Sequence, residues 1–152
     1  MSTDTPLQPA PRKRTIVTAA AIYFALVFAV GLLAGPVRVM WIEPVLGTTI
    51  AVLLETPVLL AAMWFAARLA PHWAGVSGGW LSYLAIGLIA LALQQIADLA
   101  VGFGLRGMTV PAQLAYFATP PGWIYAFSLA AFALMPLIRR KRAALAGHMS
   151  EA

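Results

Sequence analysis

The 152-residue chain contains no cysteine, and Lys, Arg, Asp and Glu together make up only 10% of it. The absence of cysteine excludes disulfides, thiolate zinc sites, dithiol redox chemistry and a cysteine nucleophile. A soluble domain carries roughly 25% charged residues, because its surface faces water. Since 62% of this chain is hydrophobic, most of its surface must face lipid. We therefore expect an integral membrane protein.

Acidic residues are also scarce, with 5 against 10 lysines and arginines, which gives a net charge of +5. The basic residues flank the apolar runs: 12–14 precede the first run and 139–142 follow the last. Charges at these places orient membrane helices and contact anionic headgroups. This distribution indicates the lipid bilayer as a partner and argues against nucleic acid.

Four apolar runs are long enough to cross a bilayer, which takes about 20 residues. They predict an all-α fold, an integral membrane four-helix transmembrane bundle over 16–138. The first run is long for a signal peptide and lacks a small residue where cleavage would occur, so we expect a retained helix. The predicted spans are 16–34, 47–69, 80–105 and 122–138.

Two segments, one before the first span and one after the last, are expected outside the membrane. Residues 1–15 are predicted to be a disordered, basic N-terminus, because they are polar and lack an apolar period. Met135-Pro136 is expected to end the last span, and 139–152 to form a short basic tail.

Between the third and fourth spans, Thr109 followed by Pro111 predicts the start of a short helix over 109–118. We expect this helix to lie in the membrane interface, with Tyr116 and Phe117 dipping into lipid.

The distribution of basic residues predicts the orientation. Four spans place both termini on one side, which also holds 12–14, Arg68 and 139–142, whereas the other side holds only Arg38 and Arg106. Because cytoplasmic loops carry the excess of Lys and Arg, we expect both termini in the cytoplasm, an N-in/C-in arrangement in the bacterial inner membrane.

Two acids lie inside predicted spans, where an ionisable residue needs a partner. At 1.5 Å per residue, Glu55 lies about 12 Å, Asp98 about 9 Å and Gln94 about 15 Å from the outer ends of their helices. Arg38 stands just above that depth. Our hypothesis is that Arg38, Glu55, Gln94 and Asp98 form one hydrogen-bonded cluster that faces the bundle interior.

This cluster has two interpretations. The favoured one is structural, because buried ion pairs more often fix which helix faces which than carry chemistry. The functional one is that Glu55 or Asp98 binds and releases a proton or a cation from the outer side.

The remaining polar residues predict no chemistry. Glu43 and Arg106 are a candidate charged pair of the outer loops, and Glu43 can instead pair with Arg38. His72 and His148 are single histidines without a second ligand nearby, so we expect no metal. The chain has no Ser/His/Asp grouping, phosphate loop or HExxH motif, which predicts no catalytic residue and no cofactor.

The stretch 35–57 contains the pattern GPVRVMWIEPVLG…AVLLETP. It resembles the pattern of a family of small, four-span bacterial inner-membrane proteins, in which a basic residue often follows the loop proline where this chain has Val45. The resemblance implies no activity. The matching positions are Gly35, Arg38, Trp41, Pro44, Gly47, Glu55 and Pro57.

The sequence thus favours a structural or accessory membrane component that is not an enzyme and that works as a homo-oligomer or within a larger membrane complex. The alternative is a small proton- or ion-coupled transporter or channel, with Glu55 and Asp98 as its ion site.

Overall fold

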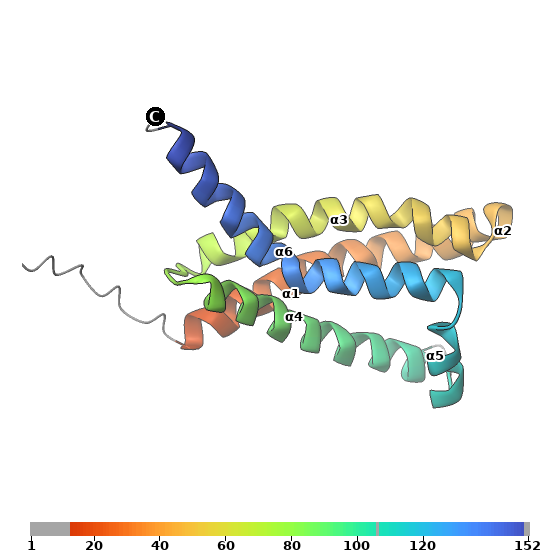
Figure 1. Cartoon of the computed structure of the whole chain (residues 1–152). Coiled ribbons are helices and arrows are strands. Elements are labelled where there is room, and N and C mark those ends of the chain that lie inside the picture. Colours follow the sequence, from red (N-terminus) through yellow and green to blue (C-terminus); the bar gives the residue numbers. More distant parts are fainter. Residues whose placement is uncertain (1–12, 106, 151–152) are drawn as a thin grey trace, which may run out of the picture.

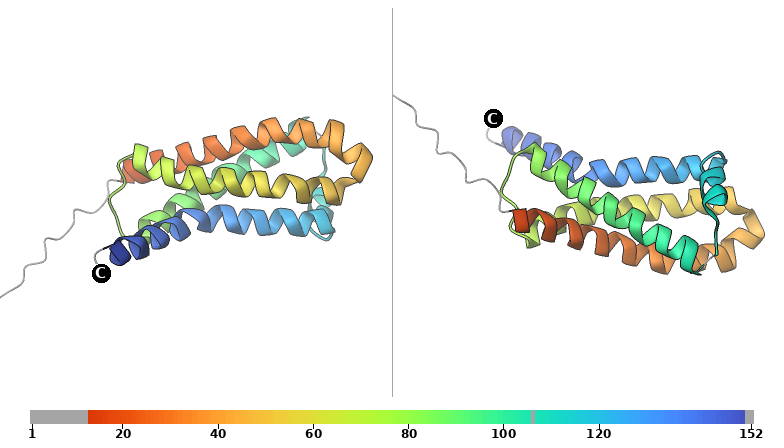
Figure 2. Two further views of the ribbon diagram at one scale, coloured as in Figure 1. Left: turned by 90° about the horizontal axis from the view of Figure 1, so that it is seen from above. Right: turned by 90° about the horizontal axis from the view of Figure 1, so that it is seen from below.

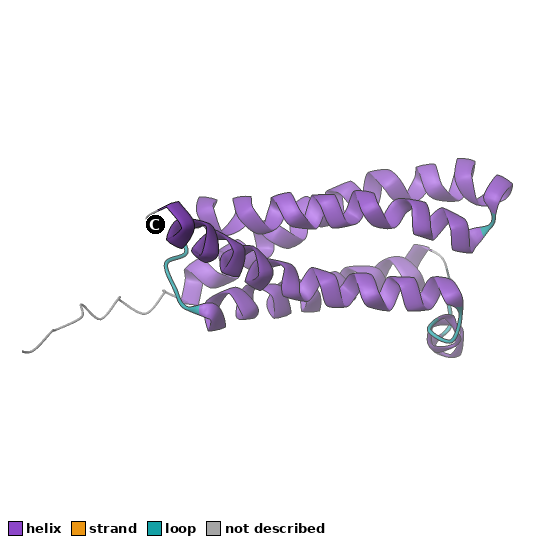
Figure 3. Ribbon diagram, turned by 45° about the horizontal axis from the view of Figure 1, so that its top comes forward, coloured by secondary structure: helices purple, strands orange, loops and turns teal. Residues whose placement is uncertain are grey.

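A computed structural model describes residues 13–105 and 107–150. This part of the chain consists of helices joined by short loops (Figures 1 and 3). Most of the predicted N-terminal segment and Arg106 lie outside the described residues. The elements are α1 (Lys13–Val37), η1 (Arg38–Ile42), α2 (Glu43–Leu46), α3 (Thr48–Trp73), α4 (Trp80–Ala100), η2 (Val101–Leu105), α5 (Val110–Tyr116) and α6 (Pro120–Ser150), of which η1 and η2 are π-helical.

Within the described residues, four helices are long and apolar enough to cross a membrane: α1 with its extension, α3, α4 and α6. The predicted all-α four-helix bundle is therefore confirmed, and the protein is a multi-pass membrane protein.

The four long helices pack in a ring. Helix α1 packs against α3 and α4, and α6 packs against the same two helices, so the α1–α3 and α4–α6 contacts lie on opposite sides of the bundle. Helices α2 and α5 lie at one end, which we call the α5 end (Figure 2). The other end, which we call the basic end, holds the start of α1, the turn after α3 and the bend of α6 (Figure 1).

Two aromatic rings occupy the centre of the bundle. Tyr23 of α1 and Phe132 of α6 are fully buried, and their rings stack with centroids 4.7 Å apart. Small residues let the helices approach closely around them. At Gly87 of α4, a β-carbon would lie 1.8 Å from the Ala133 carbonyl oxygen of α6, so only glycine fits there.

Helices α1 and α6 each run through a proline. Helix α1 continues beyond residue 34 through Pro36 into the π-helical η1. The prediction that Met135-Pro136 ends the last helix is wrong, because α6 runs through Pro136 to Ser150. Its C-terminal part bends away from the bundle (Figure 1), as expected where proline removes a helical hydrogen bond.

The predicted short helix is present as α5, and Thr109 caps it by accepting a hydrogen bond from the Ala112 amide. Tyr116 and Phe117, which we expected to dip into lipid, are half-buried in the structure. Both rings pack against Tyr125 of α6, with centroids 6.3 and 5.9 Å away.

Candidate functional site

The first candidate site joins α1 to α3 near the α5 end. Glu55 lies in the second turn of α3, and Arg38 is the first residue of η1. The Arg38 Nε atom lies 3.3 Å from Glu55 Oε2, and the two side chains are only 18% and 11% exposed. Arg38 Nε is buried and makes no hydrogen bond within the described part of the chain. The contact is therefore an ion pair that leaves one donor of the guanidinium unsatisfied.

Local backbone geometry places Arg38 opposite α3. Pro36 lacks an amide hydrogen, so the helix loses one regular hydrogen bond just before this point. The chain then widens into a π-helical turn, in which the Glu43 amide donates to the Arg38 carbonyl oxygen five residues earlier. Single π-helical turns often occur at functional sites, because they redirect one side chain within a helix.

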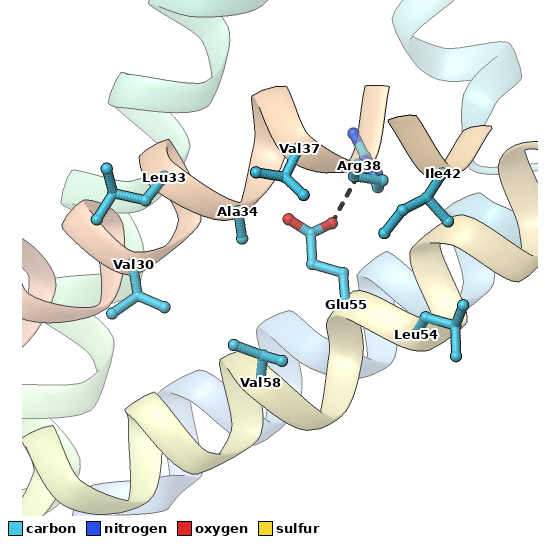
Figure 4. Close-up of a pocket in the computed structure, with 9 residues that line it drawn as sticks. All are labelled: Val30, Leu33, Ala34, Val37, Arg38, Ile42, Leu54, Glu55 and Val58. Carbon is cyan, nitrogen blue, oxygen red and sulfur yellow. Dashed lines mark ion pairs between the residues drawn. The ribbon is translucent and has the colours of Figure 1, made fainter. Parts of the chain in front are cut away.

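The Arg38–Glu55 pair lies in a groove of about 360 Å³ between α1 and α3. Figure 4 shows the Glu55 carboxylate reaching from α3 toward Arg38, with aliphatic side chains around both. Several of these, including Leu33, Leu54 and Val58, are exposed on the outside of the bundle. The groove therefore faces sideways, toward the surroundings of the bundle. Its lining residues are Val30, Leu33, Ala34, Val37, Arg38, Ile42, Leu54, Glu55 and Val58.

The second candidate site joins α4 to α6. Gln94 Nε2 donates to Asp98 Oδ1 at 2.8 Å, one helical turn away. The Tyr125 hydroxyl of α6 donates to Asp98 Oδ2 and accepts a longer hydrogen bond of 3.4 Å from Gln95 Nε2. We call Gln94, Gln95, Asp98 and Tyr125 the Asp98 group. Both carboxylate oxygens of Asp98 thus have a protein partner.

The predicted single cluster of four residues is divided in the structure. Arg38 and Glu55 meet at the α1–α3 contact, whereas Gln94 and Asp98 meet at the α4–α6 contact on the opposite side of the bundle. Glu55 and Asp98 have similar calculated depths along their helices, but α3 and α4 lie diagonally across the ring, so the two acids do not meet.

Of the predicted outer-loop pair, Glu43 and Arg106, the structure describes only Glu43. Glu43 accepts a hydrogen bond of 2.6 Å from the Thr48 hydroxyl, which links α2 to α3, and the ion pair of Arg38 is with Glu55. Arg106, the other member of the predicted outer-loop pair, lies outside the described residues.

Sequence reasoning missed Tyr125 and Gln95. Tyr125 is the sixth residue of α6, so it lies about 8 Å from that helix start at 1.5 Å per residue. This depth matches the one calculated for Asp98, and a buried tyrosine hydroxyl needs a hydrogen-bond partner. The depth argument, applied to tyrosine as well as to charged residues, finds this contact.

The residues that the structure describes contain no group of three His, Cys, Asp or Glu side chains able to hold a metal ion. Comparison of the chain with protein-family models, curated proteins and solved structures finds no match.

Proposed function

We propose that the protein is a non-catalytic structural or accessory component of the bacterial inner membrane, with both termini in the cytoplasm. The observation that carries the proposal is that each membrane-embedded acid has a partner within the bundle. Glu55 pairs with Arg38, and Asp98 accepts hydrogen bonds from Gln94 and Tyr125.

Such contacts are strong constraints on helix packing. An ionisable group left unpaired in lipid costs several kcal/mol, so each acid selects the neighbouring helix that satisfies it. The Arg38–Glu55 pair selects α3 as the neighbour of α1, and the Asp98 group selects α6 as the neighbour of α4. The choice of neighbouring helices is therefore enough to explain why both acids are present inside the bundle.

An accessory protein also needs a surface for its partner. The groove between α1 and α3 faces sideways, and large apolar side chains surround it, with Leu33 75% exposed. Apolar surface inside a bilayer contacts either lipid or another transmembrane helix. The proposal is that one face of this bundle contacts another membrane protein or a second copy.

Site-specific photo-crosslinking in intact membranes tests this proposal. A photoreactive residue replaces Leu33 beside the groove or, as a matched control, Phe127 on α6, which is 77% exposed. We expect a discrete adduct of higher mass from position 33 and none from position 127. A lack of discrete adducts from both positions contradicts the accessory role at this face.

The alternative proposal is a small proton- or ion-coupled transporter or channel, and the groove that reaches Glu55 from the side is the observation that favours it. The test is proton flux into vesicles that contain the purified protein and a trapped pH-sensitive dye. The structural role predicts flux equal to that of protein-free vesicles. Flux that Glu55→Gln or Asp98→Asn abolishes, with the helical content unchanged, supports transport instead.

A further inference from the structure

The basic end of the bundle has its own cluster of interacting side chains, far from both acids. The Arg139 guanidinium of α6 lies 4.1 Å from the centre of the Trp64 ring of α3, and that of Arg142 lies 5.1 Å from the same ring. Arg140 lies over Tyr83 of α4 at 5.7 Å. Cation–π contacts of this kind hold guanidinium groups in place on a ring face. Helix α6 is thus attached to both of its neighbours through arginines.

No acid among the residues that the structure describes lies beside these arginines. The acids among the described residues are Glu43, Glu55 and Asp98. All three lie toward the α5 end of the bundle, in α2, near the start of α3 and near the end of α4. Arg139 Nε is buried and has no hydrogen-bond partner in the described part of the chain. The basic end therefore combines an unsatisfied buried donor with concentrated positive charge. Its described basic residues are Lys13, Arg14, Arg68, Arg139, Arg140, Lys141 and Arg142.

We propose that Arg139 and Arg142, held on the Trp64 ring at the α3–α6 contact, bind the phosphate of an anionic phospholipid. A phosphate supplies several acceptor oxygens, and the planar guanidinium fork of arginine matches its geometry. Basic clusters at the ends of transmembrane helices are typical sites for anionic lipid headgroups. This inference goes beyond the proposed function and holds for either orientation of the protein.

The surroundings of the site favour a lipid over a free phosphate ion. Phe65 and Leu69 follow Trp64 along α3, and both are exposed. On α6, Leu134 and Ile138 precede the arginines and are also exposed. A phosphate bound by the arginines therefore lies beside apolar surface on both helices, where the acyl chains of a lipid can pack.

Mass spectrometry of the intact protein in detergent micelles tests the site, with phosphatidylglycerol as the probe and phosphatidylcholine as the neutral comparison. We expect the wild-type protein to retain phosphatidylglycerol selectively. The double variant Arg139→Gln/Arg142→Gln should bind it about 30-fold more weakly, since each arginine near an anionic lipid contributes about a factor of five.

The matched control is Lys13→Gln/Arg14→Gln, which removes the same charge from exposed residues at the same end of the bundle. Helix α1 lies diagonally across the ring from α6, whereas the site is at the α3–α6 contact. Because salt screens charges that are distant from the phosphate, this control should change binding less than about threefold. An equal loss in both double variants overturns the proposal, because binding then depends on net charge alone.

Trp64 provides a test that keeps every charge. Trp64→Leu removes the ring that holds both guanidiniums, whereas Trp64→Phe keeps an aromatic face that binds cations more weakly. We expect phosphatidylglycerol binding to be strongest in the wild-type protein, weaker in Trp64→Phe and weakest in Trp64→Leu. This order tests the proposal even if the arginine double variant does not fold. Equal binding by all three proteins contradicts the site.

Inorganic phosphate distinguishes the two sources of the anion. We expect it to leave phosphatidylglycerol bound at equal concentration, because it lacks acyl chains. Displacement of the lipid by phosphate under these conditions overturns the assignment to a phospholipid and indicates a site for free anions.

Discussion

The Tyr23 hydroxyl of α1 donates a hydrogen bond of 2.8 Å to the Phe132 carbonyl oxygen in the middle of α6. In a regular helix this carbonyl accepts from the amide four residues later, but that residue is Pro136, which has no amide hydrogen. Tyr23 thus supplies the donor that Pro136 removes. This contact explains how a proline is accommodated inside a membrane helix next to the fully buried Phe132 ring.

Tyr23→Phe should destabilise the protein by about 1–3 kcal/mol, because a buried carbonyl loses its partner while the ring packing is kept. In a Pro136→Ala background the helix regains its own donor, so the same substitution should cost less than about 1 kcal/mol. The measurement is the free energy of unfolding in detergent micelles, monitored by circular dichroism. It is made on the wild type, the two single variants and the double variant. Equal costs of Tyr23→Phe in both backgrounds contradict the explanation.

The Arg38–Glu55 pair should behave as one unit in the same unfolding measurement. Arg38→Met or Glu55→Leu alone leaves a charge buried without its partner and should cost about 3–5 kcal/mol. The double variant should cost clearly less than the sum of the two, since no charge remains. As a control, Glu43→Gln affects an exposed contact with Thr48 and should cost below about 1 kcal/mol. If the effects of the two single substitutions simply add, the ion pair does not contribute to the free energy of unfolding.

Much of the fold follows from the sequence because a membrane span needs only length and low polarity. The four spans are of this kind. The start of α5 follows instead from a local capping rule, with Thr109 as the N-cap. The end of α6 does not follow from the sequence, since Pro136 alone predicts a break. The compensating donor, Tyr23, lies 109 residues before Phe132, whose carbonyl it satisfies. Local rules therefore fail where a distant side chain satisfies the backbone.

The position of each site residue along its helix could be predicted from the sequence, but the neighbouring helix that it faces could not. Glu55 and Asp98 do meet polar partners, and Arg38 and Gln94 are among them. Which residues share a site depends on which helices are neighbours, and depth along the helix axis carries no information about that. The ring order of the helices separates the two acids, and only the contact between α4 and α6 brings in Tyr125.

Gly87 should tolerate no larger residue. In Gly87→Ala the new β-carbon lies 1.8 Å from the Ala133 carbonyl oxygen, so α4 and α6 must separate. We expect a loss of about 1–3 kcal/mol or more in unfolding free energy. Gly35→Ala is the matched control, because a β-carbon at position 35 has no neighbour within 4 Å. Its expected change is zero or a small gain from helix propensity. A neutral Gly87→Ala contradicts the close contact.

The proposed orientation predicts which end of the bundle faces the cytoplasm. The chain has no cysteine, so a single introduced cysteine is the sole thiol that can react. Val45→Cys places it on α2 at the α5 end, where position 45 is 79% exposed, and Ser77→Cys places it in the exposed turn at the basic end. Because basic residues gather at the cytoplasmic side, a membrane-impermeant maleimide added to intact spheroplasts should label Val45→Cys alone. Ser77→Cys should react only after lysis. The reverse pattern contradicts the N-in/C-in arrangement, yet it leaves the predicted phospholipid site testable, since that site depends on Trp64 and the α6 arginines rather than on the side they face.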